Sequence, residues 1–127
     1  MTDANPGLEV LYVEDSDYLR ELTIEFFREL GHNVVAVFNA DLALENLAKR
    51  TFDVMMTDVS LPGMSGLELA KSVAERYPQL PIVISSGHDT ITEALLIEKL
   101  QHNFRVLPKP YDLETFQKVI EEITRRS

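Results

Sequence analysis

The feature that most constrains this chain is a fivefold alternation of short apolar runs with longer amphipathic segments. The apolar runs are rich in β-branched residues, as buried strands are, and they lie at 8–13, 33–38, 52–57, 82–85 and 104–107. Apolar residues at helical spacing predict helices over 17–30, 39–50, 65–76, 90–100 and 113–125. Because strands that alternate with helices form parallel sheets covered on both faces, we expect an α/β protein with one doubly wound sheet of five β–α units.

Two of the predicted helices differ in how clearly their apolar residues indicate a buried face. In the first helix, the residues that share one face are Leu19, Leu22, Phe26, Phe27 and Leu30, and we expect this face to pack against the core. The helix over 90–100 is unusually rich in Leu and Ile. Its apolar residues fit either the core or a contact surface.

A length of 127 residues fits one domain with a core of its own. We expect residues 1–7 to form a flexible leader and residues 8–127 to form the domain. The leader is polar and lacks a basic n-region and an apolar h-region, so it is not a signal peptide. No apolar run approaches membrane-spanning length, and the absence of cysteine fits a reducing compartment, so we expect a soluble, cytoplasmic protein.

The formal net charge of −9 argues against a general affinity for nucleic acid or for an anionic membrane. A metal ion or a basic protein surface remains compatible with this charge. Two phosphate-binding motifs are also absent from the sequence: Gly-x-Gly-x-x-Gly after the first strand, and Gly-x-x-x-x-Gly-Lys-[Ser/Thr]. These absences disfavour a dinucleotide-binding fold and a P-loop protein.

Polar residues with useful chemistry follow four of the five predicted strands. Glu14 and Asp15 come after the first strand, Asp58 after the third, Ser85 and Ser86 after the fourth and Lys109 after the fifth. Taken alone, each has a simpler interpretation as a helix cap, a turn residue or a surface lysine. Since the carboxyl ends of parallel strands share one edge of the sheet, the ordered set favours a common site at that edge.

The residue types in this set predict metal-assisted phosphoryl transfer. Crowded carboxylates favour a hard divalent cation, and Mg²⁺ takes oxygen ligands while it keeps several waters. Asp58 would hold the cation with one carboxylate oxygen and attack phosphorus with the other. Lys109 would pair with Asp58 before the reaction and with a phosphoryl oxygen after it, and the Ser86 hydroxyl would donate to another phosphoryl oxygen. His88 has no second histidine at a useful spacing, so we expect it to be a solvated loop residue.

The sequence around these strand ends resembles the receiver domains of two-component response regulators. The resemblance is carried by 13–15 (Val-Glu-Asp), 57–66 (Thr-Asp-Val-Ser-Leu-Pro-Gly-Met-Ser-Gly), 81–87 (Pro-Ile-Val-Ile-Ser-Ser-Gly) and 109–110 (Lys-Pro), and it extends from about residue 8 to residue 125. It implies the flavodoxin-like strand order 2-1-3-4-5. It also implies a phosphoryl group received from the phosphohistidine of a sensor histidine kinase or a histidine phosphotransfer protein.

The resemblance assigns roles to the site residues as well. Asp58 would be the phosphoacceptor, and Ser86 and Lys109 would bind the phosphoryl group. The Mg²⁺ ligands would be Asp15, Asp58, the backbone carbonyl of Ser60 and, directly or through water, Glu14. The bond between Lys109 and Pro110 would be cis. A downstream protein would bind the face formed by the fourth helix, the fifth strand and the fifth helix.

One position departs from the family pattern. Receivers carry Tyr or Phe three residues before the lysine, where this chain has Val106. Phe104 lies two residues earlier on the same side of the strand and is not an obvious substitute. We therefore expect the phosphorylation chemistry to be retained, while the usual coupling of the hydroxyl to rotation of an aromatic ring is altered or weak.

Three other functions would share parts of this sequence pattern. A phosphatase of the haloacid dehalogenase type would also use a strand-end aspartate with Mg²⁺, but it needs a second aspartate where this chain has Ser60. A receiver fold used only as a binding module is disfavoured by the complete site and mildly favoured by Val106. A flavin-binding relative would need a phosphate-cradling loop where Glu14 and Asp15 stand. The expected protein is a signalling domain rather than an enzyme, with slow autodephosphorylation at most.

Overall fold

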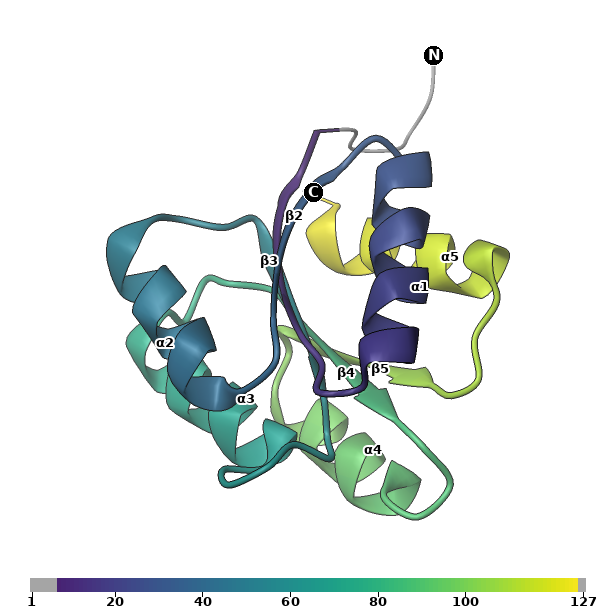
Figure 1. Ribbon diagram of the computed structural model, residues 1–127. Coiled ribbons are helices and arrows are strands. Elements are labelled where there is room, and N and C mark those ends of the chain that lie inside the picture. Colours follow the sequence, from purple (N-terminus) through teal and green to yellow (C-terminus); the bar gives the residue numbers. More distant parts are fainter. Residues whose placement is uncertain (1–6, 126–127) are drawn as a thin grey trace.

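The computed structural model describes residues 7–125, which form a five-stranded sheet between two layers of helices (Figure 1). In chain order the elements are β1 (Glu9–Val13), α1 (Asp17–Glu29), β2 (Asn33–Val37), α2 (Ala40–Lys49), β3 (Val54–Asp58), α3 (Gly66–Arg76), β4 (Ile82–Ser86), α4 (Ile91–Leu100), β5 (Phe104–Pro108) and α5 (Leu113–Thr124). The strand order is β2-β1-β3-β4-β5, and all neighbouring strands are parallel. The predicted fold class and strand order are therefore confirmed. The predicted leader lies outside the described residues except for Gly7.

The two faces of the sheet are covered by different helices (Figure 1). On one face, Phe27 of α1 and Phe116 of α5 belong to the same buried cluster. On the other face, Leu47 of α2, Val73 of α3 and Ala94 of α4 belong to a second cluster. Strands β3 and β4 are buried along their whole length, which explains why their sequences are continuous apolar runs rather than alternating ones. Within residues 7–125, no helix combines the length and the apolar character that a bilayer span requires.

Most helices begin where the sequence predicts, because a side chain accepts a hydrogen bond from the first turn. The capping residues that do so are Ser16, Asn39, Ser65 and Asp112. Strand β3 begins at Val54 rather than at residue 52 as predicted. Phe52 instead lies before the strand, half-buried, with the guanidinium of Arg50 at 4.9 Å from its ring centroid.

In two helices, α1 and α4, some apolar residues are exposed although their spacing in the sequence is compatible with burial. Leu22 of α1 was expected to face the core but is 41% exposed. The buried stripe of α1 instead includes Thr23, whose hydroxyl is 2.7 Å from the Tyr111 hydroxyl and is thereby satisfied. In α4 only Ala94 is buried, while Leu96 and Leu100 are 57% and 79% exposed. The leucines of α4 therefore lie at the surface, while Ile91 and Ile97 are partly buried against the core.

His32, just before β2, couples the stability of the fold to pH. Its side chain is buried, and Nδ1 accepts a hydrogen bond from the Leu8 N–H at 3.3 Å. Burial lowers the pKa of His32, and the nearby charge of Glu121 opposes this only in part. The folded protein therefore favours the neutral imidazole, while the unfolded chain takes up a proton near its usual pKa of about 6.5. The stabilisation is fully present above that pH and is lost as the pH falls below it.

We predict that His32→Gln loses less stability on acidification than the wild type does. The free energy of unfolding would be measured by urea titration at pH 7.5 and at pH 5.5, and the drop between the two compared. The exposed histidine variant His102→Gln serves as the control and should show the wild-type drop. An equal drop in His32→Gln and in the wild type would contradict the assignment.

Candidate functional site

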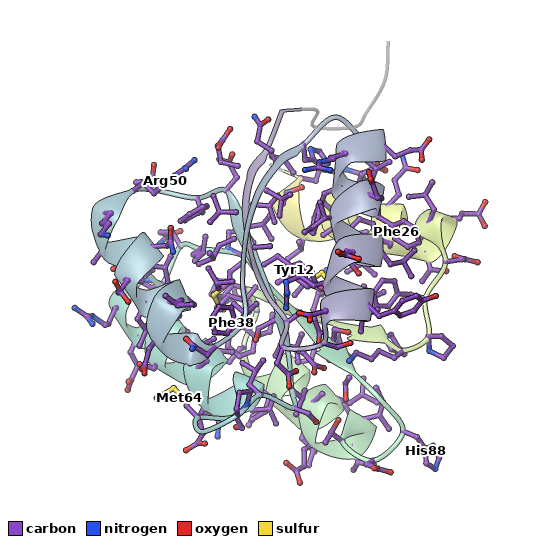
Figure 2. The ribbon with its side chains drawn as sticks, in the orientation of Figure 1. Tyr12, Phe26, Phe38, Arg50, Met64 and His88 are labelled. Atoms are coloured by element: carbon purple, nitrogen blue, oxygen red, sulfur yellow. The ribbon has the colours of Figure 1, made fainter. Side chains whose placement is uncertain are left out.

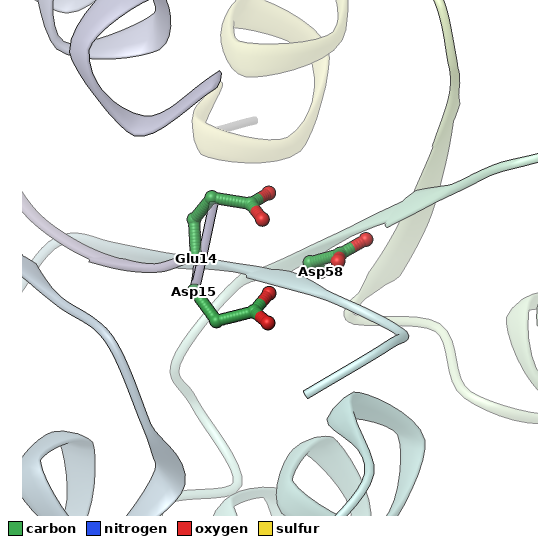
Figure 3. Close-up of side chains that lie close together, drawn as sticks. All are labelled: Glu14, Asp15 and Asp58. Carbon is green, nitrogen blue, oxygen red and sulfur yellow. The ribbon is translucent and has the colours of Figure 1, made fainter. Parts of the chain in front are cut away.

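The carboxylates predicted to form a site meet at the carboxyl edge of the sheet. Figure 3 shows the side chains of Glu14, Asp15 and Asp58 directed into one shared space, the first two from the end of β1 and the third from the end of β3. One oxygen from each lies within 4.8 Å of the others. Parallel pairing brings them together, since Val13 is the register partner of Thr57 and the chain continues from each by one residue. The sequence prediction that these groups converge is confirmed for these three residues.

Glu14 and Asp15 differ in their surroundings although they are neighbours in sequence. Asp15 is exposed, whereas Glu14 is 1% exposed. One carboxylate oxygen of Glu14 accepts a hydrogen bond from the Ser16 N–H at 3.1 Å, but Oε1 has no hydrogen-bond partner. Burial, followed by the negative charge of Asp58, raises the pKa of Glu14 to about 7.

Lys109 supplies the positive charge of the site. Its Nζ lies 2.7 Å from Asp58 Oδ1 and 3.7 Å from Glu14 Oε1. Burial alone lowers the pKa of Lys109, but the hydrogen bond to Asp58 and the charges of Asp58 and Glu14 outweigh it, so its pKa lies above the ordinary value. The backbone N–H of Lys109 donates to the Ser86 carbonyl at 2.8 Å, and the Lys109–Pro110 bond is cis, as the resemblance implied.

The cluster has the composition of a cation site. Three carboxylates face one ammonium group, and a buried carboxylate oxygen of Glu14 lacks a hydrogen-bond donor. A divalent cation is the ligand that such crowded oxygens accept, because it removes their mutual repulsion and satisfies the unpaired oxygen. The residues present therefore fit the predicted metal.

The structure agrees with the predicted roles of the remaining residues to different extents. Ser86 lies at the end of β4, but its hydroxyl is directed to Thr90 Oγ1, at 2.7 Å, and not to Asp58. Ser60 is exposed in the loop after β3, and the role of its carbonyl stays a prediction. His88 is an exposed loop residue whose side chain projects away from the molecule, in agreement with its expected character (Figure 2).

Gly66 is a residue of the site that the sequence argument missed. It is the first residue of α3, and its N–H donates to the Val59 carbonyl at 2.7 Å. A Cβ atom at this position would lie 1.8 Å from the backbone oxygen of Asp58. The missing side chain thus allows α3 to pack directly on the backbone that carries the Asp58 carboxylate. The signal in the sequence was a glycine directly after the helix cap Ser65, where a helix start does not require glycine.

The chain is similar to known proteins of one family. Residues 10–121 match the family described as response regulator receiver domain. The DNA-binding transcriptional regulator NtrC of Escherichia coli (strain K12) is 32% identical over 112 residues, which cover 88% of this chain and 24% of NtrC. The sensor protein TorS of the same strain is 33% identical over 116 residues, which cover 90% of this chain and 12% of TorS. The chain thus spans a quarter or less of the length of these two relatives.

A solved structure agrees with the sequence relatives. The chemotaxis response regulator CheY4 of Vibrio cholerae superimposes with a TM-score of 0.81 at 28% identity, covering 92% of this chain and 98% of that one. The match extends over the sheet and the helices, and it includes the edge of the sheet where the carboxylates meet. This chain belongs to the response regulator receiver domain family, whose members are phosphoacceptors in two-component signalling.

Proposed function

We propose that Asp58 is the phosphoacceptor of this receiver and that it takes its phosphoryl group from a phosphohistidine on a sensor histidine kinase or a histidine phosphotransfer protein. The observation that carries the proposal is the 2.7 Å contact between Asp58 Oδ1 and Lys109 Nζ within a cluster of carboxylates. In this cluster Asp58 is the carboxylate closest to the ammonium group. Asp58 is therefore the carboxylate whose phosphorylated form the Lys109 ammonium group can bind.

The transfer requires one bond to form and one to break. A carboxylate oxygen of Asp58 forms a bond to phosphorus, while the phosphorus–nitrogen bond to the donor imidazole breaks and its electron pair returns to the nitrogen. Lys109 then pairs with an oxygen of the transferred group instead of with the free carboxylate. Because such transfers depend on positioning and on neutralisation of charge, a lysine already in contact with the nucleophile supplies much of what the reaction needs.

Mg²⁺ fits the same cluster and is part of the proposal. Its ligands would be Asp15, Asp58 and the Ser60 carbonyl, with Glu14 binding directly or through water. When bound, the cation neutralises negative charge on the phosphoryl oxygens during transfer. Oε1 of Glu14 supports this role, because it is buried without a hydrogen-bond donor and Lys109 Nζ, at 3.7 Å, is too far away to supply one.

We predict that Mg²⁺ stabilises the folded protein and that Asp15→Asn weakens this effect. A ligand that binds only the folded state adds about 1.4 kcal/mol when present at tenfold its dissociation constant. Thermal unfolding would be followed with and without MgCl₂, at equal ionic strength set with KCl. The control variant Asp41→Asn removes an exposed carboxylate at the start of α2 and should respond to Mg²⁺ like the wild type. An undiminished response in Asp15→Asn would argue against this site.

The function itself is tested with a small phosphodonor. Incubation with acetyl phosphate and Mg²⁺ should add one phosphoryl group to the chain, as read by intact mass, and EDTA should prevent the addition. Absence of any labelling, together with retained Mg²⁺ binding, would instead favour the second candidate, a receiver fold used only as a binding module. Val106 is the feature that keeps this second candidate under consideration, because it replaces the aromatic residue of the family pattern.

We further propose that a downstream protein binds the face formed by α4, β5 and α5. The exposed leucines of α4 support this face, with Leu95, Leu96 and Leu100 at 42%, 57% and 79% exposure. Several apolar side chains exposed together on one helix are unusual on a protein surface without a partner. The expected output is a protein contact or passage of the phosphoryl group to another histidine, rather than turnover of a substrate.

A further inference from the structure

The Ser86 hydroxyl is engaged by α4 in this structure. Ser86 is 1% exposed, and its Oγ lies 2.7 Å from Thr90 Oγ1. A second, longer contact of 3.4 Å runs to the Gly87 carbonyl. Thr90 is the N-cap residue of α4, so the hydrogen bond joins the end of β4 directly to the start of this helix.

The pleat of the sheet explains why the hydroxyl points toward α4. Asp58 of β3 is the register partner of Ser85, so these two side chains lie on the same face of the sheet. Ser86 lies on the opposite face, the one to which Ile84 contributes, and Ile84 belongs to the same buried cluster as Ala94 of α4. To reach a phosphoryl group on Asp58, the Ser86 hydroxyl must therefore turn away from α4. That movement removes it from Thr90.

The engagement of Thr90 leaves α4 without a side-chain cap. The other four helices each begin with a side chain that accepts a hydrogen bond from the first turn. The Thr90 side chain makes no such bond, and its backbone, with φ −115° and ψ 2°, is outside the extended region that capping residues adopt. Threonine is a good N-cap residue, so its hydroxyl can serve α4 once Ser86 no longer holds it.

The rest of α4 packs on the sheet through one buried residue and two partly buried isoleucines, Ile91 and Ile97. Ala94 is its single buried residue, and the Glu98 carboxylate accepts a hydrogen bond from the Val106 N–H of β5 at 2.8 Å. A helix with one fully buried side chain can shift at lower cost than the fully buried strand beside it. A change at Thr90 can thus spread along α4 and reach β5 through Glu98.

We propose that Thr90 is a positioning residue that holds the Ser86 hydroxyl away from Asp58 in the unphosphorylated protein. When Ser86 turns to a phosphoryl group on Asp58, Thr90 is released, caps α4 and shifts the helix that carries the exposed leucines. This inference rests on the phosphoacceptor role proposed for Asp58. It gives the chain a route from the site to α4 that needs no aromatic residue at position 106.

The test uses beryllium fluoride with Mg²⁺ as a phosphoryl analogue and follows backbone amide signals by NMR. In the wild type, signals should shift both around Asp58 and in the first turn of α4. In Thr90→Val the shifts around Asp58 should remain, while those in the first turn of α4 should fall to less than half. Thr90→Ser restores a hydroxyl and should restore the α4 response. Thr92→Val, which removes an exposed hydroxyl from the same helix, should behave like the wild type.

A second measurement requires no phosphoryl analogue. Ser86→Ala removes the partner of Thr90, so the first-turn signals of α4 should move toward their positions in the wild-type complex with beryllium fluoride. An unchanged α4 in Ser86→Ala, or a full α4 response in Thr90→Val, would overturn the role of Thr90 alone. If the wild type shows no response around Asp58, the proposed phosphoacceptor function fails, and this inference fails with it.

Discussion

Replacing Asp58 with asparagine is expected to abolish the addition of a phosphoryl group to this chain from acetyl phosphate. The asparagine amide has nearly the same shape as the carboxylate, but it is neutral and is not a nucleophile toward phosphorus. It also removes the ion pair with Lys109, whose Nζ lies 2.7 Å from Asp58 Oδ1 in the wild type. Intact mass spectrometry after incubation with the donor and Mg²⁺ measures the fraction labelled.

The matched control is Asp53→Asn, which changes the aspartate immediately before the first residue of β3. Asp53 accepts a hydrogen bond from the Glu9 N–H at 2.7 Å, far from the carboxylate cluster, so this variant should be labelled like the wild type. Labelling of Asp58→Asn to the wild-type extent would show that Asp58 is not the phosphoacceptor. Mapping the label by peptide mass would then show whether Glu14 or Asp15 carries it.

Gly66→Ala is expected to destabilise the protein by about 2–3 kcal/mol, the upper part of the range typical of overpacking, because the site cannot relax. The new Cβ would lie 1.8 Å from the Asp58 backbone oxygen and 2.9 Å from the Val59 Cα. Since both neighbours are backbone atoms, either α3 or the end of β3 must move. Urea unfolding measures the loss of stability, and the rate of labelling by acetyl phosphate should fall because the backbone of the phosphoacceptor is displaced.

Gly87→Ala is the control for this prediction. A Cβ at Gly87 meets no heavy atom within 4 Å, so its effect on stability should stay within about 0.5 kcal/mol. If Gly66→Ala were as stable as Gly87→Ala, close packing of α3 on the Asp58 backbone would not require glycine at position 66. If it were destabilised yet labelled at the wild-type rate, the contact would support the fold without positioning Asp58.

Lys109 and the carboxylates were predictable from the sequence because parallel strands all end at one edge of a sheet. The apolar runs show where each strand ends, and the residue that follows each run is then assigned to that edge. The same argument correctly joined Glu14 to Asp58, which are 44 residues apart in the chain. Periodicity was sufficient here because the fold repeats one local unit.

Contacts between side chains were less predictable. Leu22 lies where helical spacing favours burial, yet α1 buries Thr23 in its stripe because Tyr111, from the distant loop before α5, satisfies the threonine hydroxyl. The leucines of α4 are exposed because this helix turns Ile91, Ala94 and Ile97 toward the core instead. In both cases the outcome depends on which distant group occupies the neighbouring space, and sequence spacing carries no information about that.

The arrangement of the chain into five β–α units and the set of groups at the strand ends are encoded locally, in patterns of a few residues that can be read directly. The burial and the hydrogen-bond partners of those groups depend instead on how distant segments pack together. Glu14 is buried and Asp15 exposed, Gly66 touches the backbone of Asp58, and the Ser86 hydroxyl is held by Thr90 rather than facing Asp58. These differences arise when the packed helices set the solvent exposure and partners of each group, because burial and hydrogen bonding are properties of the assembled fold.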